Sequence, residues 1–297
     1  MSKNCPIMER MKKNYENRSK TYLTRKIPVI IRLDGKAFHT YTKSLNKPFD
    51  EGLISDMQQT AIHLCQNIQG AKCAYTQSDE ISILITDYNK LTSEGWFNYN
   101  VQKMTSISAS IAASRFNNLR FLRDLREEWI EKDIVENGDV NSTKEFFEML
   151  EYSYDGMELL ANFDSRVFSI PKEEVNNYFI ARQRDAVKNS ISMLAQSLYS
   201  HKELYGKNGN QMQELCFQKG HNWNDLHFSK KRGSFIMKNV HVNGKIISDP
   251  VMNGQSIDRH RAYAVNAMGL KDPVIRTVWQ TVDTPEFSKN DIINKLC

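Results

Sequence analysis

The sequence has few cysteines and no long apolar run. Its cysteines form no CxxC pair and have no regular spacing; they are Cys5, Cys65, Cys73, Cys216 and Cys297. This pattern argues against a disulfide framework and against a structural zinc site. No apolar run approaches the roughly 20 residues that cross a bilayer, and the N-terminal segment is charged throughout. We therefore expect a cytoplasmic protein with reduced thiols and no membrane partner.

The chain also lacks a strong charge of one sign. It carries 40 Lys and Arg against 35 Asp and Glu, which gives a formal net charge of +5. Such a balance is compatible with a polyanionic partner but does not require one. The 297 residues are enough to bury a hydrophobic core without disulfides or a structural metal. Length and composition therefore favour a globular enzyme.

The spacing of apolar residues predicts an alternation of helices and strands. We predict helices over residues 5–20, 50–68 and 96–118, and strands over residues 29–33, 71–77, 81–86 and 163–170. After the first helix, the order β-α-β-β-α-β is that of the ferredoxin-like α+β fold, in which helices lie on one face of an antiparallel sheet. RNA-binding modules, nucleotide cyclases and polymerase palms all use this fold.

The second half of the chain has a different pattern. Residues 172–229 are mostly helical in spacing, and residues 233–248 form a hairpin pattern with Asn243-Gly244 as its turn. We predict a palm-like catalytic domain with an N-terminal helix over residues 1–171. Residues 172–297 are predicted to form a helical and hairpin extension packed on that domain.

Two carboxylates stand at related positions of the predicted sheet. Asp34 follows the first strand, and Asp79 lies at the tip of the hairpin at residues 78–80. In a ferredoxin-like sheet the third strand lies antiparallel beside the first, so both side chains should point into one cleft. Carboxylates with a backbone carbonyl suit Mg²⁺, and two such ions can activate a hydroxyl and stabilise a leaving pyrophosphate. Each motif alone also fits an ordinary turn, but together they favour a metal site.

The residues after Asp34 extend this candidate site. Gly35 lacks a Cβ and lets the backbone approach a phosphate or a metal, although a plain strand-to-helix turn uses glycine as well. Lys36 and His39 could then meet a triphosphate. The alternative for His39 is a surface histidine at the start of a helix.

Several motifs in the chain match those of a known family. RLDGKAFHTYT at residues 32–42 resembles the signature R-x-D-G-x-x-F-H, and SDEIS at residues 78–82 resembles S-D-E-hydroxyaromatic-S, with Ile81 at the aromatic position. Further matches, in order, are Lys47-Pro48 with Asp50, Trp96-Phe97 with Lys103, FDSR at 163–166, Arg182-Gln183, QEL at 213–215, NWNDL at 222–226 and KRG at 231–233. As a set they are specific and cover most of the chain. The sequence thus resembles the tRNA-His guanylyltransferase family, especially its bacterial-type guanylyltransferase-like branch.

This resemblance implies a palm-like nucleotidyltransferase that adds nucleotides to the 5′ end of tRNA in the 3′-to-5′ direction. The 3′-hydroxyl of an incoming GTP or other nucleoside triphosphate would attack the RNA's 5′ phosphate. That phosphate is activated by adenylylation with ATP, or the RNA already carries a triphosphate. The resemblance also implies a homotetramer. Residues 187–190 (VKNS) replace the His-Ile-Asn-Asn segment of eukaryotic members, so the branch resemblance indicates template-dependent repair of 5′-truncated tRNAs rather than strict tRNA-His selection.

The resemblance also assigns roles to individual residues. Asp34, the Gly35 carbonyl and Asp79 resemble the ligands of two Mg²⁺ ions, with Asp34 and Asp79 as the catalytic carboxylates. The residues that resemble the nucleotide-binding set are Asp34, Gly35, Lys36, Ala37, Phe38, His39, Ser78 and Asp79. Lys47, Asp50 and Lys103 resemble activation-site residues. Glu80 matches the motif and would either bind metal or stabilise the hairpin.

Two other functions fit the same strand order. A nucleotide cyclase would use the same two carboxylates, and an RNA-binding module would stack bases on strand aromatics. The candidate aromatics are Tyr75, Phe163 and Phe168, which form no clear cluster. Four arginines recur near helical spacing and would either contact the RNA backbone or form a solvated basic face; they are Arg115, Arg120, Arg123 and Arg126.

Overall fold

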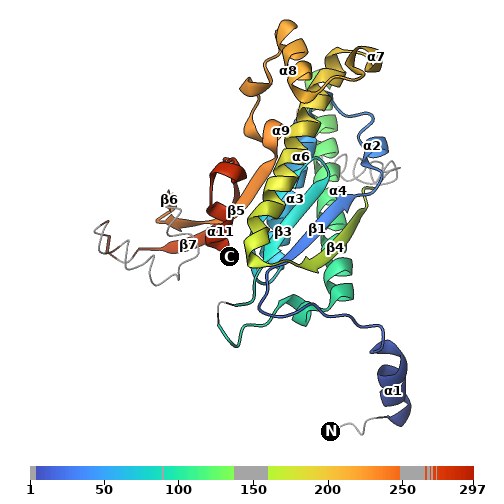
Figure 1. Ribbon diagram of the computed structural model, residues 1–297, viewed down its shortest axis with the longest axis vertical. Helices are drawn as coiled ribbons and strands as arrows, with labels where there is room; N and C mark the ends of the chain where they lie inside the picture. The colour runs from blue at the N-terminus through green and yellow to red at the C-terminus, as the bar shows by residue number, and fades with distance from the viewer. Residues whose placement is uncertain are drawn as a thin grey trace.

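An antiparallel sheet of seven strands forms the centre of the protein in a computed structural model, which describes residues 5–88, 90–136, 160–247, 265, 268, 270, 271 and 273–297 (Figure 1). The strands follow the order β4-β1-β3-β2-β5-β6, and β7 also pairs with β5. Their bounds are β1 Val29–Gly35, β2 Ala71–Gln77, β3 Glu80–Ile85, β4 Phe163–Ser169, β5 Ser234–Val242, β6 Lys245–Ile247 and β7 Ile275–Val282. Every pairing is antiparallel.

The first four strands have the predicted ferredoxin-like arrangement. β1 and β3 are central neighbours, in register from Val29 opposite Ile85 to Asp34 opposite Glu80. Their runs of β-branched residues are buried on both faces of the sheet, as expected for central strands. The predicted fold class is therefore confirmed, with β1 extending to Gly35 and β3 beginning at Glu80.

Helices cover both faces of this sheet (Figure 1). The two connecting helices, α3 (Glu51–Asn67) and α4 (Val101–Glu136), lie on the predicted single face and share a core with Val29, Ile31 and Leu33. A third long helix, α6 (Lys172–Leu198), packs on the opposite face, where Phe179 joins the core that contains Ile30. Because successive strand residues point to opposite faces, β1 contributes to both cores.

The remaining elements are short. They are α1 Pro6–Met11, a π-helix at Lys12–Glu16, α2 Phe38–Tyr41, a 3-10 helix at Trp96–Tyr99, α7 His201–Leu204, α8 Gly209–Gln218, a 3-10 helix at Trp223–Asp225, α9 Phe228–Arg232, a 3-10 helix at Phe287–Lys289 and α11 Ile292–Leu296. α1 projects away from the sheet (Figure 1). In the described part of the chain, no helix is long and apolar enough to span a membrane.

The C-terminal region continues the same sheet. β5 pairs with β2 from Ser234 to Met237, and its far half pairs with β6 across the predicted turn, where Asn243 and Gly244 both have positive φ. Two residues with positive φ are the requirement of a type I′ hairpin. The sequence pattern gave no indication of β7. The division of the chain after residue 171 stays a prediction.

Candidate active site

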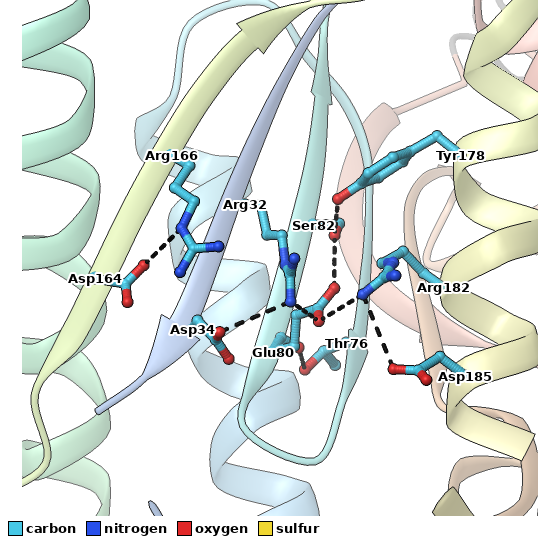
Figure 2. A network of polar contacts seen from close by, with 10 residues as sticks. All are labelled: Arg32, Asp34, Thr76, Glu80, Ser82, Asp164, Arg166, Tyr178, Arg182 and Asp185. Carbon is cyan, nitrogen blue, oxygen red and sulfur yellow. Dashed lines mark hydrogen bonds and ion pairs between the residues drawn. The ribbon is translucent and has the colours of Figure 1, made fainter. Parts of the chain in front are cut away.

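The face of the sheet under α6 carries an ordered pattern of charges at the end of β1. Cross-strand pairing places Asp34 beside Glu80 on β3 and beside Asp164 on β4. Two residues earlier along β1, Arg32 lies beside Arg166. Residues opposite one another in a sheet share a face. Glu80, Asp34 and Asp164 therefore form an acidic row at the end of β1. Arg32 and Arg166 form a basic row two residues further from that end (Figure 2).

Asp34 and Asp79 meet at this edge. The Gly35 N–H donates a hydrogen bond of 3.1 Å to the carbonyl oxygen of Asp79, which joins the end of β1 to the hairpin tip. Burial raises the pKa of Asp79, and the negative charge of Asp34 acts in the same direction. The two carboxylates are therefore close enough to repel each other, and a cation between them would relieve that repulsion.

The donor atoms at this edge fit Mg²⁺. Asp34 and Asp79 offer carboxylate oxygens, and Gly35 offers a backbone carbonyl, all of which are hard ligands. Among the described residues, no cluster of three or more His, Cys, Asp and Glu side chains could hold a metal. Mg²⁺ usually keeps several waters and takes its further ligands from substrate phosphates.

Glu80 is occupied by other partners. Its side chain is buried, and its Oε2 accepts hydrogen bonds from Arg32 at 2.7 Å and from Arg182 of α6 at 3.3 Å. The Ser82 hydroxyl donates to Oε1 at 3.4 Å and also contacts the Tyr178 hydroxyl at 2.8 Å. Burial raises the pKa of Glu80, and the two arginines act against that rise. These contacts favour stabilisation of the hairpin over metal binding.

The segment after β1 is partly exposed and partly core. Lys36, Ala37 and His39 are exposed, and Ala37 has a φ of 55°. Phe38 is buried against Phe116 and Phe163, so only its backbone can contact a nucleotide. A Cβ on Gly35 would lie 2.2 Å from the Phe38 ring, and this close approach requires glycine.

A cavity of about 350 Å³ opens beside the hairpin tip. Gln77 and Ser78 border it on the sheet side, residues of α6 such as Asn189 and Met193 on another, and the segment that precedes α3 on a third. Its size suits part of a nucleotide. Ser78 is exposed and has a φ of 50°, which brings it next to both Asp79 and the cavity.

The structure brings together two of the three predicted activation-site residues. Lys47 and Asp50 both line the cavity, and the Lys47 ammonium donates to the Thr42 carbonyl at 2.7 Å. Asp50 is the N-cap of α3 and accepts from the Leu53 N–H at 2.7 Å, which is a structural role. Lys103 lies in the first turn of α4, with its ammonium 5.9 Å from the centre of the Phe97 ring. It is not part of the described lining of the cavity.

The arginines of α4 have partners that the sequence did not predict. Arg123 binds buried Asp56 of α3 through two hydrogen bonds, of 2.6 and 3.1 Å, and Arg120 reaches the same carboxylate at 3.4 Å. These pairs contradict a solvated basic face for the two side chains, whereas RNA contact by them stays a prediction. The Arg126 side chain lies outside the described residues.

The three strand aromatics considered for base stacking are buried or packed against other side chains. Tyr75 is buried, and its hydroxyl donates to the Arg232 carbonyl at 2.7 Å. Phe163 is buried in the α3 and α4 core, and Phe168 packs against Tyr178. An RNA-binding module that stacks bases on its strands is disfavoured for this reason.

Sequence reasoning assigned no role to Arg32, Tyr178 and Arg182, which surround Glu80. One signal was available for Arg32, because it lies two residues before Asp34 and must share its face. The contacts of Tyr178 and Arg182 depend on how α6 crosses the sheet, and no local pattern reports that.

Comparison with known proteins relates the whole chain to one family. Residues 8–171 match the family model described as "Thg1: tRNAHis guanylyltransferase". A bacterial tRNA(His) guanylyltransferase-like protein in complex with ATP is 38% identical, with a TM-score of 0.70 and 98% of both chains covered. The corresponding complex with GTP is 36% identical, with a TM-score of 0.68 over 98% of this chain and 99% of the other. A probable tRNA(His) guanylyltransferase of Dictyostelium discoideum is 24% identical over 230 residues, 73% of this chain and 77% of its own.

Proposed function

Because the chain belongs to the tRNAHis guanylyltransferase family and is a nucleotidyltransferase, we propose that it adds nucleotides to the 5′ end of tRNA in the 3′-to-5′ direction. Its substrates are 5′-truncated tRNAs, and the incoming base is chosen by pairing with the opposite strand. The observation that carries the proposal is the meeting of Asp34 and Asp79 at one edge of a palm-like sheet.

The residues at this edge divide the work of the reaction. Asp34, Asp79 and the Gly35 carbonyl would hold two Mg²⁺ ions, whose chemistry is to activate the attacking hydroxyl and stabilise the leaving phosphates. Lys36, His39 and Ser78 border this position and would orient the triphosphate of the incoming nucleotide. The cavity beside Ser78 would receive the nucleoside and exclude water from part of it.

The electrophile is the 5′ phosphate of the RNA. A 5′-monophosphate needs adenylylation by ATP before attack, with release of AMP afterwards, whereas a 5′-triphosphate releases pyrophosphate directly. Complexes of similar bacterial proteins with ATP and with GTP support a site that accepts both nucleotides. Lys47 and Asp50 at the cavity support an activation step near the same edge.

Assembly as a homotetramer is part of the proposal. Large apolar side chains are exposed on and near the projecting α1, among them Ile7, Met8 and Tyr15. Exposed apolar groups gathered on one projecting segment are typical of surfaces that pack against another chain. Light scattering on the purified protein would test the assembly.

The function is tested by incubating the protein with labelled GTP, Mg²⁺ and a set of tRNAs that are 5′-triphosphorylated and lack one 5′ nucleotide. We expect labelled tRNA one nucleotide longer than the substrate, formed most efficiently on the tRNAs in which a cytidine stands opposite the missing nucleotide. A labelled cyclic nucleotide formed without tRNA would instead identify a cyclase, and RNA binding without any product would identify a binding module.

A further inference from the structure

A second arginine lies close to the carboxylate edge, and the proposed function does not use it. Arg166 stands on β4 beside Arg32, and Asp164 stands beside Asp34. Figure 2 shows Asp164 and Arg166 on the side of β1 opposite to Tyr178 and Arg182 of α6. In the described part of the chain, β4 pairs only with β1 and forms an outer strand of the sheet. Asp164 and Arg166 therefore lie at the border of the sheet.

The two arginines of the basic row differ in what they bind. Arg32 is 25% exposed and is held by Glu80 at 2.7 Å and Asp34 at 3.7 Å. Arg166 is 60% exposed, and within the described residues its ion pair is the one between its Nε and Oδ1 of Asp164, at 3.4 Å. Asp164 is itself 54% exposed, and pairs this exposed are weak. The terminal nitrogens of Arg166 are thus placed to bind a further anion.

The position of the cavity indicates which anion this is. The cavity is bordered by Gln77 and Ser78 of the β2–β3 hairpin, whereas Arg166 belongs to β4, on the other side of β1 in the strand order. If the incoming nucleotide occupies the cavity, the second reactant must approach Asp34 from a different side. β4 is the outer strand on the other side of Asp34 from the hairpin, and the second reactant is the 5′ end of the RNA.

We propose that Arg166 binds the 5′-terminal phosphate of the RNA and holds it beside Asp34, an inference that rests on the proposed function. Arg166 lies one strand spacing across, about 5 Å, and two residues along, about 7 Å, from Asp34, within reach of a long side chain. The guanidinium fork matches two oxygens of a phosphate. In the free protein Asp164 pairs with the Nε of Arg166, and the terminal nitrogens would bind the phosphate.

The test measures binding in the absence of nucleotides, so that no turnover occurs. One truncated tRNA is prepared with a 5′-monophosphate and with a 5′-hydroxyl, and the dissociation constant of each is measured by fluorescence anisotropy. We expect the wild-type protein to prefer the phosphorylated RNA by about tenfold, the size of a charge-assisted contact. Arg166→Gln should abolish the preference, because it weakens binding of the phosphorylated RNA only. Arg166→Lys should keep part of the preference.

Two further variants act as controls. Asp164→Asn keeps Arg166 and removes its partner, so the preference should persist or increase. Arg184→Gln removes an exposed arginine of α6 and should leave the preference unchanged. Circular dichroism verifies that each variant is folded.

Several results would overturn the inference. The first is a wild-type protein that binds both RNAs equally well. The second is an Arg166→Gln variant that binds both RNAs more weakly by the same factor, or binds neither more weakly. The third is a loss of the preference in Arg184→Gln as large as in Arg166→Gln. An increase only in the KM for GTP would place Arg166 on the nucleotide side and also overturn it. A wild-type protein that adds no nucleotide would instead refute the proposed function, because the binding preference is measured without addition.

Discussion

The main-chain N–H of Gly35 donates a hydrogen bond of 3.1 Å to the carbonyl oxygen of Asp79. This bond links the last residue of β1 to the turn that precedes β3, so the two strands cannot shift relative to one another without breaking it. The separation of the Asp34 and Asp79 carboxylates is thereby set by the backbone rather than by the side chains alone. Changes to either residue or to Gly35 should affect the same site.

Replacing either carboxylate should abolish addition and preserve the fold. Asp34→Ala or Asp79→Ala removes an anionic ligand from the edge of the sheet rather than a packed core side chain, and we expect the rate of nucleotide addition to fall by at least about a hundredfold. Single-turnover assays measure the rate, and circular dichroism the fold. Full activity in either variant would refute the two-metal interpretation.

The same pair should oppose stability when no metal is present. Because burial and Asp34 raise the pKa of Asp79, ionisation of this side chain costs more free energy in the folded protein than in the unfolded chain. Asp79→Asn should therefore raise the Tm in EDTA, while added Mg²⁺ should raise the Tm of the wild type more than that of the variant. Differential scanning fluorimetry with and without Mg²⁺ measures both effects. An equal response to Mg²⁺ in both proteins would contradict a metal site at Asp79.

Gly35→Ala should damage the fold itself. The added Cβ would lie 2.2 Å from the buried Phe38 ring, and overpacking of this kind costs about 1–3 kcal/mol. The matched control is Gly209→Ala in α8, where an added Cβ meets nothing within 4 Å. Urea unfolding measures the free energy of unfolding of both. A loss as large in the control would show that the Phe38 contact is not the cause.

Asp56 should prove important for stability although it lies outside the active site. Asp56→Asn leaves Arg120 and Arg123 without their buried carboxylate partner, and such a loss costs about 3–5 kcal/mol. Asp124→Asn removes a 57% exposed partner of Arg120 at 3.6 Å and should cost about 1 kcal/mol or less. Chemical unfolding compares the two variants. If the two variants lost similar free energies of unfolding, the contact of Asp56 with Arg120 and Arg123 would not be a main source of stability.

Lys103→Ala tests whether activation and addition are separable. If Lys103 serves activation, its loss should slow addition to a 5′-monophosphorylated tRNA and have less effect on the triphosphorylated form, which needs no adenylylation. The ratio of single-turnover rates on the two RNAs measures this, with Lys207→Ala as an exposed control in the turn after α7. An equal loss on both RNAs would assign Lys103 to the addition step or to the fold.

The sequence predicted those parts of the fold that depend on local periodicity. The runs that became β1, β2, β3 and β4 have the β-branched and aromatic residues of buried strands, and their order determined the sheet topology. The predicted meeting of Asp34 and Asp79 follows from that topology, because the third strand of this fold must lie beside the first.

Contacts that depend on helix docking were not predictable in this way. Arg182 reaches Glu80 across 102 positions of sequence, and the choice of Asp56 as the partner of Arg123 depends on how α3 and α4 pack. β7 was missed because its pairing partner, β5, lies about 40 residues earlier in the chain. Local spacing reports whether a residue is buried, but not which distant partner it meets.

The 27 residues of α6 form one rod of about 40 Å that touches three parts of the molecule in succession. Arg182 contacts Glu80 in the charged rows, Asn189 lines the cavity, and the Ser190 hydroxyl accepts a hydrogen bond from the Trp223 indole at 2.9 Å. Beyond these, Leu194 belongs to the small core beneath α8. A rigid rod transmits a tilt along its whole length. A change in the tilt of α6 would therefore move the core beneath α8, the cavity wall and the contact with Glu80 together.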